Sequence, residues 1–294
     1  MTLSLTDLSD GLANLVERAG PSVLGIGGAT GIAWTDDLAI TSASSMRCAK
    51  GAIQVRLPEG GTTEGSILGV DPASDLAVVR VPQGCLAPIA RSSEAKGIRV
   101  GEVVLALGRP GRALRASQRI VGLVGKDVRA RRGLVLRDYV EMDRGFPDGF
   151  VGGPVIDTSG TLVGLGTDRV IRGADLAMTT AQLAPIVDQI VQDGRPKLGW
   201  LGVAVQPARL PERLASEVPS LTGALVTAIE PAGAADTAGI VVGDVVVALD
   251  TATIEGPDAL LAMLRNLADK TVSLRLVRGG AIATVTATVG TRKR

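Results

Sequence analysis

The side chains that could act as nucleophiles gather in one short stretch, where Ser42, Ser44, Ser45 and Cys48 lie close together in sequence. A serine hydroxyl is a weak nucleophile at neutral pH and needs a neighbouring base, most often an imidazole, to take its proton. The 294 residues include no histidine. No Ser-His-Asp or Cys-His site can therefore form from this chain.

A lysine could replace the imidazole only if it were desolvated enough to lose its proton. Lys50 is close to the serines, but it lies in a polar turn at residues 47–51. Serines in such loops are in most cases turn formers. A hydrolase with a rearranged, histidine-free site stays open as an alternative, and it predicts activity that is abolished by replacing Ser44, Ser45 or Cys48 with alanine.

The elements that would position these residues are short strands separated by Gly, Asp and Pro turns. The expected strands are 23–26, 31–34, 38–41, 53–57, 66–71, 76–81, 103–108, 120–124, 134–141 and 161–167. Many short strands at regular spacing favour a barrel or a sandwich. An amphipathic helix is expected before them, within residues 1–20, and another after them, at 181–192.

A second unit begins near residue 198, after the helix stop and linker at Asp193-Gly-Arg-Pro. Its expected strands are 201–205, 224–229, 244–249, 272–277 and 283–289. A helix is expected over 257–267, because Pro257 is well suited to the first helical position.

Three segments of the first unit carry a family resemblance. They read GATGI from Gly28, VDPASDLAVVRV from Val70, and VGGPVIDTSGTLVGL from Val151. Together they resemble the protease domain of the HtrA/DegP family. In the second unit, KLGWLGVAV from Lys197 and IEPAGAADTAGIVVGDVV from Ile229 resemble that family's PDZ domain.

The resemblance implies a mainly β fold, with a chymotrypsin/trypsin-like double β-barrel followed by a C-terminal PDZ domain of the α+β class. We expect an N-terminal helical segment at 1–20, the barrel domain at 21–192, a linker at 193–198 and the PDZ domain at 199–291.

The departures from the family pattern fall on the chemistry. The resemblance places Ser44 at the position of the triad histidine and Val151 at that of the nucleophilic serine, and it keeps only the aspartate, Asp75. The backbone amides of Gly149 and Val151 can still form an oxyanion-type pair, because such donors do not depend on the side chain. Phe150 and Val151 are expected to make the former cleft apolar and partly filled.

These departures predict that the chain is not an enzyme but a degenerate protease that binds peptides as a scaffold or regulator. Losing the base or the nucleophile costs triad hydrolases on the order of 10⁶ in turnover. Asp75 is expected to accept hydrogen bonds from nearby amides or hydroxyls. A non-catalytic subunit that assembles with an active HtrA-like paralogue is a further alternative.

The peptide-binding residues implied by the PDZ resemblance are Trp200, Leu201, Gly202 and Val203 in the carboxylate-binding loop, and Leu260, Met263 and Leu264 on the helix. Backbone amides of such a loop capture a terminal carboxylate, and the adjoining strand pairs with the ligand. The alternative for the helix leucines is that they belong to the ordinary helix core.

Composition narrows the remaining classes of function. The formal net charge is +1 and aromatic residues make up 2% of the chain, which argues against nucleic-acid partners. With no histidine and only two cysteines, no metal site or cofactor is expected. Residues 1–20 have no basic segment followed by an apolar run, so no signal peptide or membrane segment is expected. The predicted location is cytoplasmic, with a periplasmic or secreted location as the alternative if a leader was removed.

Overall fold

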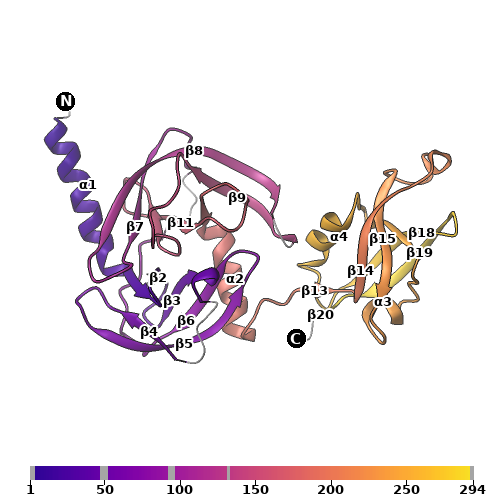
Figure 1. Ribbon diagram of the computed structural model, residues 1–294, viewed down its shortest axis with the longest axis horizontal. Coiled ribbons are helices and arrows are strands. Elements are labelled where there is room, and N and C mark those ends of the chain that lie inside the picture. Colours follow the sequence, from indigo (N-terminus) through magenta and orange to yellow (C-terminus); the bar gives the residue numbers. More distant parts are fainter. Residues whose placement is uncertain (1–3, 47–51, 92–96, 131–132, 292–294) are drawn as a thin grey trace. The chain divides into compact units, whose positions relative to one another are not determined.

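The computed structural model describes residues 4–46, 52–91, 97–130 and 133–291 (Figure 1). It divides into two compact units, one formed by residues 1–130 and 136–196 and the other by residues 131–135 and 197–294. The first unit contains the barrels and the second a smaller sheet with two α-helices.

Two closed six-stranded barrels make up the first unit, with strand orders β1-β2-β3-β6-β5-β4 and β10-β11-β12-β9-β8-β7. The first uses β1 (Val23–Ile26), β2 (Ala29–Ala33), β3 (Leu38–Ser42), β4 (Ala52–Arg56), β5 (Thr62–Asp71) and β6 (Leu76–Arg80). The second uses β7 (Val103–Gly108), β8 (Arg115–Arg129), β9 (Val135–Met142), β10 (Pro154–Ile156), β11 (Leu162–Thr167) and β12 (Leu176–Thr179). The double β-barrel expected from the sequence is confirmed.

Aliphatic side chains fill the barrels. Strand β3 is buried along its whole length and β6 along all but its last residue, which is the continuous apolar pattern of strands inside a closed barrel. Strands β10 and β12 were not expected. They are only 3 and 4 residues long, too short for an alternating pattern to stand out in the sequence.

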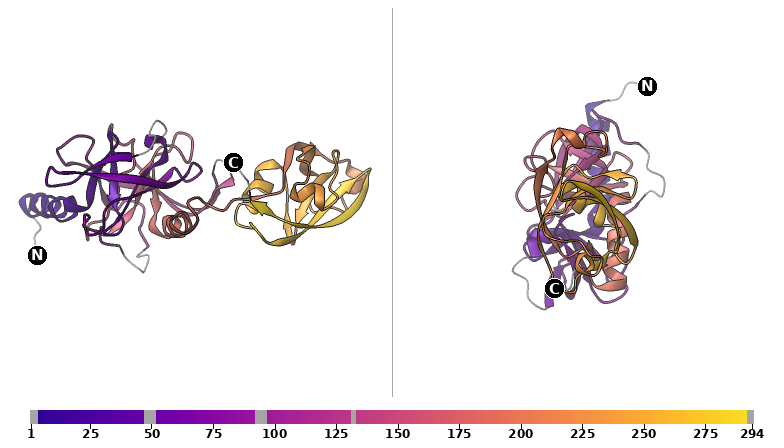
Figure 2. Two further views of the ribbon diagram at one scale, coloured as in Figure 1. Left: turned by 90° about the horizontal axis from the view of Figure 1, so that it is seen from below. Right: turned by 90° about the vertical axis from the view of Figure 1, so that its right-hand side faces the viewer.

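The described residues of the first unit also form two α-helices and two short 3₁₀ turns, which are α1 (Leu5–Ala19), α2 (Thr180–Asp193), η1 (Gly20–Ser22) and η2 (Ala43–Met46). Helix α2 buries Leu183, Val187 and Ile190 and ends at Gly194, which is left-handed with φ 71°. Helix α1 starts with a capping box between Ser4 and Asp7. It buries residues only near its C-terminal end, and its N-terminal part extends away from the barrels (Figures 1 and 2).

The second unit is a sheet of order β14-β15-β16-β18-β19, with β17 beside β16. Its strands are β14 (Val203–Arg209), β15 (Thr222–Ile229), β16 (Val245–Leu249), β17 (Ala252–Thr253), β18 (Thr271–Arg278) and β19 (Ala281–Thr288). A separate pair joins β13 (Gly199–Trp200) to β20 (Gly290–Thr291), and the helices are η4 (Glu212–Leu214), α3 (Ala234–Thr237) and α4 (Pro257–Leu264). Strand β14 lies at the edge of its sheet. The predicted PDZ fold is confirmed.

Helix α4 ends three residues before the predicted end of that helix. Within the described ranges, no helix has both the length and the apolar character that crossing a membrane requires.

Candidate functional site

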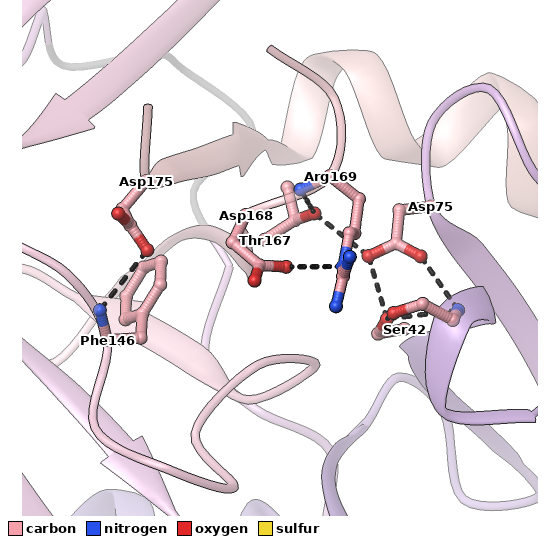
Figure 3. Close-up of polar contacts among 8 residues, drawn as sticks. Ser42, Asp75, Phe146, Thr167, Asp168, Arg169 and Asp175 are labelled. Atoms are coloured by element: carbon pink, nitrogen blue, oxygen red, sulfur yellow. Dashed lines mark hydrogen bonds and ion pairs between the residues drawn. The ribbon is translucent and has the colours of Figure 1, made fainter. Parts of the chain in front are cut away.

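The Asp75 side chain is buried between the two barrels. It is 3% exposed and left-handed with φ 55°, a conformation that aspartate tolerates better than most residues. Its Oδ1 accepts the Ser44 amide at 2.8 Å, and its Oδ2 accepts the hydroxyls of Ser42 at 2.7 Å and Thr167 at 2.9 Å (Figure 3). These three donors offset the cost of burying a carboxylate.

The hydroxyl groups beside Asp75 form a directed chain. The Oγ atoms of Ser42 and Ser44 are 2.6 Å apart. Because Ser42 donates its only hydroxyl hydrogen to Asp75, the hydrogen between the two serines must come from Ser44. The proton of the Ser44 hydroxyl therefore points along a path through Ser42 to the Asp75 carboxylate.

Ser44 also lines an open pocket of about 280 Å³ in the first unit. The pocket is lined by Gly28, Ala29, Ser44, Ser45, Gly149, Val151, Asp168 and Arg169. The structure thus brings the positions predicted for the triad histidine and the triad serine to one pocket, with Asp75 directly behind Ser44.

A loop between β9 and β10 forms one wall of this pocket. Gly149 is left-handed with φ 80°, and its carbonyl accepts a hydrogen bond from the Thr30 hydroxyl at 2.5 Å. In the part of the chain that the structure describes, the amides of Gly149 and Val151 have no hydrogen-bond partner. Two backbone donors are thus available where an oxyanion-type pair was predicted.

Asp168 and Arg169 form the opposite charged wall, immediately after β11. The Arg169 Nε lies 3.1 Å from the Asp168 Oδ1, and the two side chains are 61% and 41% exposed. The Arg169 amide donates to the Thr167 hydroxyl at 3.2 Å, which joins this wall to the Asp75 group. Figure 3 shows the Arg169 side chain between Asp168 and Asp75.

The prediction that Phe150 fills the cleft is wrong. Phe150 is 4% exposed and packs in the core of the second barrel. A Cβ atom placed on Gly108 would come within 2.7 Å of the Phe150 ring, so the ring occupies space that a larger residue at position 108 would need. Cys48 and Lys50 lie outside the described residues.

The loop predicted to bind a carboxylate lies between β13 and β14 in the second unit. Gly202 is left-handed with φ 79°. The Leu201 and Gly202 carbonyls accept the amides of Ala235 at 2.7 Å and Glu230 at 2.8 Å. Their own amides have no partner among the described residues, so two consecutive donors are available for an anion.

A cavity of about 890 Å³ adjoins this loop. Trp200, Gly202 and Val203 line it, together with the turn after β15. Three of the four loop residues predicted to bind peptide therefore face open space, whereas Leu201 is 2% exposed.

The helix residues predicted to form the groove wall lie mostly in the core. Leu260 and Leu264 are 1% and 3% exposed and share one hydrophobic cluster with Leu201. Met263 is partly buried against the same cluster. In this conformation Leu260 and Leu264 are closed to a ligand, because their side chains pack inward to hold α4 on the sheet.

Sequence reasoning missed Thr167 and Arg169 of the barrel site, and it missed the contact of Ser42 with Asp75. Thr167 reaches Asp75 across 92 positions of sequence, and no local pattern reports such a contact. The position of Thr167 at the end of a predicted strand was the only available signal.

Comparison with known proteins matches both units. Residues 29–165 match the family described as trypsin-like peptidase domain, and residues 225–278 match the PDZ domain family. A probable periplasmic serine endoprotease DegP-like from Brucella suis is 30% identical over 225 residues, covering 74% of this chain and 43% of the relative. Its namesake from Chlamydia pneumoniae is 28% identical, covering 81% and 50%. The chain thus matches about half the length of these relatives.

Solved structures agree on the fold. The HtrA-type protease AlgW with a decapeptide superposes with a TM-score of 0.76 at 23% identity, covering 96% of this chain and 99% of that one. AlgW with a tripeptide gives 0.72 at 26% identity, covering 96% and 97%.

These relatives correct two expectations from the sequence. They are named serine endoproteases, so the expectation that the chain is not an enzyme is wrong. A missing imidazole excludes one mechanism and leaves other hydrolytic routes open. They are also named periplasmic, which contradicts the predicted cytoplasmic location. That prediction relied on the composition of residues 1–20 alone.

The agreement covers both units, their order and the strand topology of the barrels. The chain therefore contains a trypsin-like peptidase domain and a PDZ domain, and it is a homologue of the HtrA/DegP proteins.

Proposed function

We propose that this protein captures polypeptides, with the loop of its PDZ unit binding a C-terminal carboxylate. The observation that carries the proposal is the pair of consecutive amides, of Leu201 and Gly202, that have no partner in the described part of the chain. Successive backbone donors of this kind make an anion-binding concavity.

The strand that follows the loop supports the same function. Strand β14 pairs with β15 on one side and is otherwise the edge of the sheet. An extended ligand can add to such an edge through main-chain hydrogen bonds. Along residues 203–206 the amides that point away from β15 are available for this pairing, whereas Pro207 has no amide. The relative AlgW is known with bound peptides.

Isothermal titration calorimetry with a pair of heptapeptides tests the proposal. One peptide ends in a free carboxylate after an apolar residue, and the other is its C-terminal amide. We expect the acid to bind at least about tenfold more tightly, because charge-assisted hydrogen bonds to the loop amides are lost in the amide. Equal affinity for both peptides would contradict the proposal.

A matched pair of glycine substitutions locates the site. In Gly202→Ala the new Cβ would lie 3.2 Å from the Trp200 ring and 3.4 Å from the Glu230 Cβ, at φ 79°. Gly239→Ala imposes a similar backbone strain at φ 76°, away from the loop and with no atom within 4 Å. Binding should weaken in Gly202→Ala and not in Gly239→Ala.

A second candidate function is hydrolysis of the captured polypeptide at a histidine-free site. The directed path from Ser44 through Ser42 to Asp75 favours it, as do the names of the relatives. The Ser44 Oγ would attack the carbonyl carbon while its proton passes to Ser42 and that of Ser42 to Asp75. The proton then returns to the leaving amine, and water hydrolyses the acyl-enzyme. Gly149 and Val151 would stabilise the oxyanion.

Turnover of unfolded casein by protein free of host proteases tests this second function. Cleavage that is abolished in Ser44→Ala and strongly reduced in Ser42→Ala would support it. Cleavage that persists unchanged in Ser44→Ala would refute this route. A carboxylate is a weaker base than an imidazole, so we expect turnover far below that of triad enzymes.

Location and assembly complete the proposal. A periplasmic location follows the names of the relatives, and cell fractionation checks it.

Assembly with itself or with another HtrA-like subunit is supported by α1, where Leu5 and Leu8 are 87% and 51% exposed. Light scattering should show a smaller assembly after Leu8→Ser. An unchanged mass would show that α1 does not take part in the contact between subunits.

A further inference from the structure

The pocket between the barrels offers hydrogen-bond donors that have no partner among the described residues. Its lining includes the unpartnered amides of Gly149 and Val151 and the guanidinium of Arg169. We propose that this pocket binds a carboxylate and therefore selects acidic side chains in the polypeptide that enters the cleft. The inference rests on the proposed function, since it requires polypeptide to reach the barrels.

Arg169 has donors to spare. Its Nε is engaged by Asp168 at 3.1 Å, and its two terminal nitrogens have no partner in the described ranges. An ion pair this exposed contributes little stability by itself. Asp168 therefore orients the guanidinium of Arg169 but leaves its other hydrogen-bond donors available. The planar fork of arginine can bind a second carboxylate through its free edge.

The carboxylate behind Ser44 is shielded from the pocket. Asp75 is 3% exposed, and its oxygens already accept bonds from Ser44, Ser42 and Thr167. Its burial therefore keeps its remaining acceptor capacity from a basic side chain in the pocket. Asp168 is the remaining acidic group in the lining, and Arg169 faces it.

A carboxylate fits this site better than a phosphate. A pocket of about 280 Å³ with one guanidinium and two amides matches a planar carboxylate group that carries a single charge. A phosphate group carries nearly twice that charge, and both Asp75 and Asp168 would repel it. Chains that enter the cleft carry carboxylates on Asp and Glu or at their C-termini.

Calorimetry with peptides blocked at both ends tests the inference on the full-length protein. Acetylated and amidated peptides have no terminal carboxylate, which weakens their binding to the PDZ loop. Three peptides differ at one central position, which is Glu, Gln or Lys. We expect the Glu peptide to bind about tenfold more tightly than the Gln peptide, the effect of a charge-assisted hydrogen bond. The Lys peptide should bind most weakly.

Three variants locate the effect. Arg169→Gln should remove the preference for Glu over Gln. Asp168→Asn should increase the preference, because the competing carboxylate is gone. Arg172→Gln changes an exposed arginine of the same loop that does not line the pocket, and it should leave the preference unchanged.

Two results would overturn the inference. One is equal binding of the Glu and Gln peptides by the unchanged protein. The other is an absence of binding by every blocked peptide while a free-carboxylate peptide still binds, which would leave the PDZ proposal intact. A free-carboxylate peptide tested on Gly202→Ala, in which the PDZ loop is impaired, shows whether a chain terminus also enters the pocket. If it does, the affinity of Gly202→Ala for this peptide should fall further when Arg169→Gln is added.

Discussion

We propose that the barrel pocket and the PDZ loop both bind polypeptide, but they depend on different parts of the chain. In the barrel pocket the nucleophile and its base are side chains, so a serine at position 44 and a valine at position 151 remove the Ser-His-Asp route even though the amides of Gly149 and Val151 remain. In the PDZ loop the donors are the amides of Leu201 and Gly202. A site built from backbone withstands sequence change as long as the loop keeps its shape.

The contrast teaches which changes each site can survive. Removing a side-chain partner should strongly affect the barrel unit. The PDZ loop should instead respond to changes in backbone conformation, as the comparison of Gly202→Ala with Gly239→Ala is designed to show.

The largest expected effect is on the stability of the barrel unit. Asp75→Ala should lower its free energy of unfolding by about 3 kcal/mol, because three donors would lose a buried acceptor. Thr167→Val removes only one of the three and should cost about 1 kcal/mol. Urea denaturation measures both. A change below about 1 kcal/mol for Asp75→Ala would show that the network does not hold the barrels together.

The PDZ unit should respond to acid through Asp244, which is fully buried. Burial by itself raises the pKa of this carboxyl, but hydrogen bonds from Arg278 and the Val241 amide outweigh it, and the net pKa lies below its ordinary value of 3.8. The Arg278 Nη2 lies 2.7 Å from the Asp244 Oδ2. The ionised form is thus favoured in the folded state.

The sign of the pH effect follows from that direction. Because the folded pKa is below the unfolded one, the stabilisation is fully present above about pH 4 and is lost as pH falls through the folded pKa. Calorimetric unfolding of the PDZ unit from pH 7 to pH 3 should show this loss, and Asp244→Asn should lack that part of it. We expect Asp244→Asn to cost about 2 kcal/mol at pH 7, reduced by the partial exposure of Arg278. Identical pH profiles for both proteins would contradict this role.

The smallest expected effect comes from restoring a hydroxyl at position 151. Val151→Ser adds a hydroxyl to the pocket but no base to activate it. Casein turnover should therefore change by less than about twofold. A large gain in turnover would show that the Asp75 network also activates the hydroxyl at position 151. The barrel site would then depend less on Ser44 than we propose.

The sequence predicted the fold well because strand patterns and loop motifs are local. The barrels, α2 and the PDZ sheet all have runs of apolar residues with recognisable ends. The partners of Asp75 were less accessible, since Thr167 reaches it from a distant strand. The burial of Phe150 in the barrel core escaped prediction, and for Leu260 and Leu264 the sequence left the groove and the helix core as alternatives. An apolar residue near a site looks the same in sequence whether it faces the ligand or the core.

The most direct test of the central claim is amide NMR of the protein titrated with the carboxylate-ended heptapeptide and with its amide. The account predicts that the resonances of Leu201 and Gly202 shift with the acid and much less with the amide, while the resonance of Gly239 stays in place. Shifts confined to other parts of the protein, or equal shifts with both peptides, would contradict capture of a carboxylate by this loop.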